Sequence, residues 1–452
     1  MTGGGLGWLG IVRLGLVQTA LGAVVVLTTS TLNRVMVVEL ALPAMLPGAL
    51  VALHYAIQML RPRLGHGSDV GGRRTPWIVG GMAVLACGGV GAAAATNLMA
   101  IHAGAGIALA VAAFMLIGLG VGAAGTSLLV LLAKAVAPER RAAAATIVWV
   151  MMIAGFVVTA GLAGHFLDPF SPARLLSVTS VVSGSALLLT LLAVRNVERG
   201  LRPAAAPGST PPATRSFRAA LAEVWAEPQA RRFTVFVFVS MLAYSAQDLI
   251  LEPFAGTVFG LTPGQSTQLA GVQHGGVLAG MLLVAVLATG RGRRRFGSLR
   301  AWSIGGCVAS AAALLALVAA GFFGAGWPLA ANVFALGTAN GAFAVAAIGS
   351  MMSLAGAGRQ GGEGVRMGLW GAAQALAFGL GGFLGTVAVD LTRALVDLPA
   401  LAYGLVFAAE AAAFLAAAML AVGVYRGTGD QASPARGMPI TAGTLLAQAG
   451  KQ

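Results

Sequence analysis

The stretch Gly65-His66-Gly67-Ser68-Asp69-Val70-Gly71-Gly72-Arg73-Arg74-Thr75-Pro76-Trp77 separates two long apolar runs of the chain. It is polar and rich in glycine, which lets two helix ends approach closely and turn within a few residues. The Asp69 carboxylate can pair with a neighbouring arginine or cap a nearby helix N-terminus. Two interpretations are open: an ordinary turn that carries positive charge, and a latch that joins two parts of a helical bundle.

Part of this stretch recurs later in the chain. A shift of 225 residues, from Gly65 to Gly290, aligns six pairs of identical residues without a gap. The pairs are Gly65, Gly67, Gly72, Trp77, Gly80 and Gly81 with Gly290, Gly292, Gly297, Trp302, Gly305 and Gly306. This repetition predicts two homologous halves. Arg294 stands in the second copy where Asp69 stands in the first, so an acidic latch is expected in only one half.

The composition is that of an integral membrane protein. Hydrophobic residues make up 58% of the chain and charged residues 9%, whereas a soluble domain has about 25% charged residues. A membrane-spanning helix needs roughly 20 apolar residues. We therefore expect an all-α membrane protein with twelve spans. Their ranges are 11–33, 44–62, 77–97, 105–133, 143–164, 174–194, 233–255, 268–289, 301–322, 327–354, 367–389 and 398–424.

The net charge of +14 would suggest a nucleic-acid partner in a soluble chain. Here the distribution of the charge gives another explanation. If the N-terminus is cytoplasmic, every Lys and Arg except Arg34, Arg174 and Arg393 falls on the inner side, and basic residues concentrate in the cytoplasmic loops of membrane proteins. The charge therefore predicts topology, with both termini in the cytoplasm and contact with anionic membrane lipids. No nucleic-acid partner is expected.

The spans divide into two groups of six. We expect an N-terminal half at 1–195, a cytoplasmic linker at 196–232, a C-terminal half at 233–425 and a cytoplasmic tail at 426–452. The linker begins with several prolines, and its second half has apolar residues at helical spacing. This pattern predicts a short amphipathic helix on the membrane surface.

Two spans carry unusual polar residues. The first ends in Asn33 and Arg34, with Glu39 close behind, and the seventh contains Gln247, Asp248 and Glu252. Arg34 and Glu39 form either a local ion pair or the mouth of a cavity. Asp248 and Glu252 are four residues apart and share a helix face, where two unpaired carboxylates would be costly. We expect these six residues to border a central cleft, in which an acid of the seventh span pairs with Arg34 or handles a proton or substrate.

His54 and Gln58 share a face of the second span, and the simplest interpretation is a histidine hydrogen-bonded inside the bundle. His274 lies early in the eighth span. The sequence contains no catalytic Ser-His-Asp order, no phosphate-binding Walker loop and no metal-ligand cluster. We expect neither catalytic residues nor a bound metal, and predict that the protein is not an enzyme.

The loop spacing Gly-xxx-Asp-xx-Gly-Arg-Arg resembles the signature of major facilitator proteins between their second and third spans, with Val70 where a basic residue is usual. The resemblance implies a major facilitator fold of twelve helices in two six-helix halves, which are parallel repeats in that superfamily. It also implies an inner-gate loop, formed by Gly65, Asp69, Gly72, Arg73 and Arg74.

Three stretches together resemble a narrower group, the PucC/LhaA family, or bacteriochlorophyll delivery branch, of purple phototrophic bacteria. They are residues 31–40, the loop 67–77, and residues 247–253. The resemblance covers the membrane part from residue 8 to about 424, although the segment between Asp69 and Arg73 is shorter than in that family.

This resemblance implies a role in assembling light-harvesting complexes in the bacterial inner (intracytoplasmic) membrane. The implied partners are antenna polypeptides and the reaction-centre complex, and delivery of bacteriochlorophyll is left open. The magnesium of that pigment needs an axial nitrogen or oxygen ligand, and His54 and His274 are the candidate pigment ligands. The rival hypothesis is a secondary transporter that couples proton movement through Asp248 or Glu252 to export of a small amphipathic solute.

Overall fold

The computed structural model describes residues 6–61, 73–137, 140–198, 222, 225–289, 297–357 and 363–425. The regular elements in these ranges are helices, as expected. The predicted linker helix lies largely outside the described residues, and the tail 426–452 lies wholly outside them.

The first half consists of α1 (Trp8–Val26), which continues through α2 (Leu32–Arg34) to Glu39, followed by α3 (Met45–Ile57), α5 (Thr75–Met99), α6 (Ala103–Ala135), α7 (Arg141–Leu167) and α8 (Pro172–Val194). The second half consists of α10 (Pro228–Phe259), α11 (Pro263–Thr289), α12 (Leu299–Phe323), α13 (Leu329–Ala357), α14 (Glu363–Leu395) and α15 (Pro399–Tyr425).

Eleven of these segments are long and apolar enough to cross a membrane, with Trp8–Glu39 counted as one span. Met45–Leu60 is apolar but shorter. The described part of the chain thus has one helix in each of the twelve predicted ranges, and the chain is a multi-pass membrane protein. Several helices extend beyond the apolar ranges predicted from the sequence. For example, α10 begins at Pro228, inside the range assigned to the linker, because proline suits the first turn, where backbone N–H groups lack helical partners.

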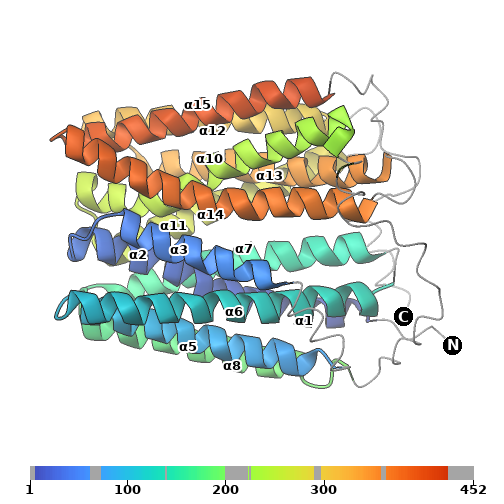
Figure 1. Cartoon of the computed structure of the whole chain (residues 1–452), viewed down its shortest axis with the longest axis horizontal. Helices are drawn as coiled ribbons and strands as arrows, with labels where there is room; N and C mark the ends of the chain where they lie inside the picture. Colours follow the sequence, from blue (N-terminus) through green and yellow to red (C-terminus); the bar gives the residue numbers. More distant parts are fainter. Residues whose placement is uncertain are drawn as a thin grey trace.

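The two halves repeat the same packing, as the sequence repeat predicts. In the first half α1 packs on α7 and α8, and α5 on α6 and α8. In the second half the corresponding α10 packs on α14 and α15, and α12 on α13 and α15. Figure 1 shows the second half beside the first with the helix axes roughly parallel. We call the end at which α1 begins and α15 ends the terminal face, and the opposite end the distal face.

Glycines bring neighbouring helices into backbone contact. A Cβ at Gly276 or Gly280 of α11 would overlap a carbonyl oxygen of α13, and a Cβ at Gly337 or Gly341 of α13 would overlap a carbonyl oxygen of α11. Because lipid competes with apolar side chains, such close packing of small residues is a main source of helix association in membranes.

The halves meet along a seam made by two helix pairs. α3 packs on α14, and α7 packs on α11, and these four helices occupy the middle of the bundle (Figure 1). The continuation of α1 adds a third contact, against α10 and α11.

Candidate functional site between the first helices of the two halves

The first span changes its winding where it reaches the second half. Residues Leu27–Thr31 and Val35–Glu39 are π-helical, and they flank the short α-helical turn Leu32–Arg34. A π-helical turn carries an extra residue and is often found at functional sites. Between these turns Asn33 and Arg34 are both buried.

Asn33 completes the backbone hydrogen bonding of α10. Pro253 lies inside that helix and has no N–H, so the carbonyl of Leu249, four residues earlier, loses its helical partner. The Asn33 side-chain amide donates to the Leu249 carbonyl oxygen at 2.6 Å. Two of the motifs singled out in the sequence are therefore in direct contact, and a buried backbone oxygen is satisfied across the seam.

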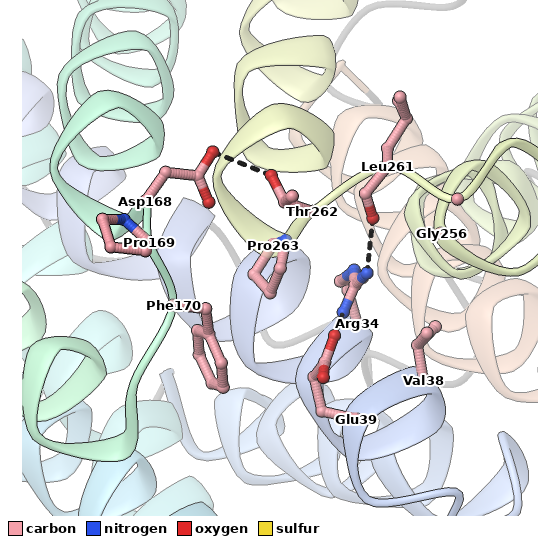
Figure 2. A pocket seen from close by; sticks show the side chains of 11 residues that line it. Arg34, Val38, Glu39, Asp168, Pro169, Phe170, Gly256, Leu261, Thr262 and Pro263 are labelled. Carbon is pink, nitrogen blue, oxygen red and sulfur yellow. Dashed lines mark hydrogen bonds and ion pairs between the residues drawn. The ribbon is translucent and has the colours of Figure 1, made fainter.

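Arg34 is held on three sides. Its guanidinium pairs with Glu39 and donates to the carbonyl oxygen of Leu261 at 2.6 Å. It also lies against Gly256, where a Cβ would sit 2.9 Å from a guanidinium nitrogen. Figure 2 shows Arg34 between Glu39 and Leu261. The structure thus contains the local ion pair, and the pair also borders a pocket.

That pocket opens on the distal part of the seam and has a volume of about 750 Å³. We call it the distal vestibule. It is lined by Arg34, Val38, Glu39, Asp168, Pro169, Phe170, Gly256, Gly260, Leu261, Thr262 and Pro263. The lining comes from both halves, with Asp168 and Phe170 on one side and Thr262 and Leu261 facing them across the opening (Figure 2).

The two acids of α10 have different surroundings. Glu252 is 2% exposed and faces Arg34 and Ser266, but neither carboxylate oxygen has a hydrogen-bond partner of standard geometry among the described residues. Asp248 is partly exposed and accepts a hydrogen bond from Gln273 at 3.3 Å. The positive charge of Arg34 therefore interacts with two acids, and of these Glu39 forms an ion pair with it whereas Glu252 is within electrostatic range.

Two buried polar side chains near these acids have no hydrogen bond to a described residue. Gln247 is fully buried, and neither its amide nitrogen nor its oxygen has a partner there. Glu410 of α15, within electrostatic range of Asp248, has two unpartnered carboxylate oxygens. Such groups are costly in a bundle core.

The two candidate pigment ligands both lie on helices of the seam. His54 Nε2 lies 2.8 Å from the Gln58 amide nitrogen, and the Gln58 oxygen accepts a hydrogen bond from Arg61. The His274 ring centroid lies 4.9 Å from that of Phe156 on α7, and its Nδ1 has no hydrogen-bond partner among the described residues.

Of the predicted inner-gate loop, Gly65, Asp69 and Gly72 lie outside the described residues. Arg73 and Arg74 immediately precede α5. The backbone N–H groups of Arg74 and Thr75 donate to the Glu198 carboxylate at 2.8 and 3.1 Å. Sequence reasoning missed this cap, although Glu198 is a lone acid among the arginines that follow α8.

Sequence reasoning also missed two aspartates on the distal face. They are Asp168, which follows α7, and Asp390, in the last turns of α14. Each bonds to the first residues of a helix in the other half. For Asp168 the available signal was electrostatic, because a carboxylate at a helix C-terminus is disfavoured by the helix dipole and needs a partner elsewhere.

This arrangement of two six-helix halves around a seam is the major facilitator fold. A bacterial homolog of the human lysosomal transporter Spinster superposes with a TM-score of 0.67, over 92% of this chain and 96% of that one. The two sequences are only 16% identical, so the likeness establishes the fold alone. The predicted fold class is confirmed.

Sequence relatives define the family. The family model described as PUCC protein matches residues 31–429, and the chain therefore belongs to the PucC family, as its motifs predicted. The "Bacteriochlorophyll synthase 44.5 kDa chain" of Rhodobacter capsulatus is 56% identical over 95% of this chain and 98% of its own length. "Protein PucC" of the same organism is 30% identical over 91% of each chain.

Proposed function

We propose that this chain is an assembly factor for a photosynthetic light-harvesting complex, which holds antenna polypeptides in the membrane and delivers bacteriochlorophyll to them. The observation that carries the proposal is the family match over nearly the whole membrane part. The relative with 56% identity, whose name refers to bacteriochlorophyll synthesis, supports the link to this pigment. The reaction-centre complex is a further partner under this proposal.

The surface of the bundle suits a helical client. An antenna helix is a single apolar span, and small residues let such a helix approach closely. Gly80 on α5 and Gly184 on α8 have open space where a Cβ would be, and these two helices pack side by side. A lipid-facing surface of this kind is compatible with holding one transmembrane helix.

Of the two histidines, His274 suits the pigment magnesium better. An axial ligand must offer a free nitrogen lone pair, and His274 Nδ1 has no partner among the described residues. His54 Nε2 is already hydrogen-bonded to Gln58. We infer that the chain binds the pigment as cargo without transforming it chemically. The described residues contain no group of three or more His, Cys, Asp or Glu side chains that could hold a metal ion.

Removal of the gene from its host tests the proposed role. Membranes of the deletion strain are expected to lose a near-infrared antenna absorbance band, and a plasmid copy should restore it. His274→Leu is expected to restore less of the band than His165→Leu, a control at a histidine exposed on α7. Normal antenna absorbance in the deletion strain would refute the proposal.

A proton-coupled transporter of a small amphipathic solute remains the second candidate, favoured by Asp248 and Glu252 within α10. Under this alternative, purified protein in liposomes moves protons when an amphipathic solute is added, and Asp248→Asn abolishes the movement. If wild-type and Asp248→Asn liposomes behave alike over a panel of such solutes, the alternative fails.

A further inference from the structure

The distal face is closed by a carboxylate from each half. Asp168 directly follows α7, and its two oxygens accept hydrogen bonds from Thr262 Oγ1 at 2.7 Å and from the Gly264 N–H at 3.3 Å. Because α11 begins at Pro263, the acid of the first half caps the N-terminus of a helix in the second half. Figure 2 shows Asp168 pointing across the vestibule toward Thr262.

Asp390 makes the reciprocal contact. Its two oxygens accept hydrogen bonds from the N–H groups of Ala44 at 2.8 Å and Met45 at 2.7 Å. α3 begins at Met45, so an acid of the second half caps the N-terminus of a helix in the first half. The two caps are equivalent in the fold, because α7 and α14 are the fifth helices of their halves, and α3 and α11 are the second.

The equivalence extends one helical turn further. Four residues before Asp168, Gly164 lies against Gln268 of α11, and a Cβ there would be 2.9 Å from the Gln268 nitrogen. Four residues before Asp390, the Thr386 side chain lies against Gly48 of α3. In each pair a glycine permits the close approach that brings the aspartate within reach of the cap.

Other hydrogen bonds also join described residues of the two halves in the distal part of the seam. Besides the two caps, they comprise Thr31 to Thr267 at 3.0 Å, Asn33 to Leu249 and Arg34 to Leu261. Deeper in the seam lie apolar and aromatic contacts, such as Tyr55 with Phe378 and the cluster of Ile153, Val277 and Met281.

We propose that Asp168 and Asp390 form a two-part latch, and that the distal face opens when both carboxylates leave the helix N-termini they cap. Asp168 stands at the C-terminal end of α7, where the helix dipole repels it, and Asp390 lies in the last turns of α14. The partner's N-terminal N–H groups stabilise it only while the halves are closed, and water takes over when they part. The seam therefore has two states, a closed one in which both carboxylates cap helices and an open one in which water hydrates them.

Distance measurements between spin labels test the latch. Labels on cysteines at Ile101 and Leu398 report on the distal face, because both side chains are exposed and follow α5 and α14 respectively. The background lacks Cys87 and Cys307. Wild type is expected to give mainly the short distance of the closed face.

Each single variant, Asp168→Ala or Asp390→Ala, is expected to raise the open-to-closed ratio by about tenfold, and the double variant by about a hundredfold, since charge-assisted bonds at separate sites add. Asp397→Ala is the matched control, because Asp397 is an exposed aspartate before α15 and should leave the ratio unchanged.

The Asp168→Asn/Asp390→Asn pair keeps an acceptor oxygen at each cap while removing the charge, and it serves if the alanine pair does not fold. It should open the face less than the alanine pair but more than wild type. A folded double variant, alanine or asparagine, with the wild-type distance distribution would overturn the proposal.

Discussion

At the scale of single residues, the first span and α10 are joined by a hydrogen bond from the Asn33 side chain to the Leu249 carbonyl, which Pro253 leaves without a helical partner. Asn33 and Pro253 are far apart in sequence, and each alone would weaken its helix region. Together they satisfy the Leu249 carbonyl oxygen, because the Asn33 amide replaces the N–H that proline lacks. Asn33 was predicted to border the cleft, and Pro253 belongs to the family-like stretch 247–253. Neither prediction could show that the partner of Asn33 is a backbone carbonyl.

The pairing predicts a measurable coupling. Asn33→Ala should lower the free energy of unfolding by about 1–3 kcal/mol, because it leaves the Leu249 carbonyl buried without a partner. In a Pro253→Ala background the same change should cost less, since residue 253 then supplies the missing N–H. Unfolding in mixed detergent micelles measures the loss of free energy caused by Asn33→Ala in each background. Equal losses in the two backgrounds would show that Asn33 does not stabilise the protein through the Leu249 carbonyl.

At the scale of helices, the length and apolar character of the spans could be predicted from hydropathy, but their winding and contacts could not. The π-helical turns on both sides of Leu32–Arg34 pack against α10, and no local propensity marks them. Similarly, only the structure shows which glycines contact another backbone and which face open space.

This difference between glycines predicts opposite outcomes on one helix. Gly280→Ala should destabilise the protein by about 1–3 kcal/mol, because a Cβ there would overlap the Thr338 carbonyl and lie 2.9 Å from the Ala342 nitrogen. Gly275→Ala on the same helix has open space, and helix propensity predicts a neutral effect or a gain of up to about 1 kcal/mol. Thermal unfolding of the two variants compares them directly, and equal losses would contradict the packing.

At the scale of the whole molecule, the repeat of loop glycines and tryptophans predicted two related halves, and the matching helix contacts agree with it. How the halves join was harder to predict. Asp168 and Asp390 carry no motif, and their partners are backbone N–H groups of helices distant in sequence. Contacts of this kind depend on the positions of helix ends, which hydropathy locates only to within a few residues.

The most direct test of this account is a disulfide across the seam. Thr31 and Thr267 are both buried, with hydroxyl oxygens 3.0 Å apart. In a background without Cys87 and Cys307, with the chain split in the linker and the halves co-expressed, Thr31→Cys with Thr267→Cys should give one oxidised band containing both halves. Thr31→Cys with Thr234→Cys, which places the second cysteine near the terminal face on α10, should not. Failure of the first pair to cross-link under oxidation, or equal cross-linking by the control pair, would contradict the junction described here.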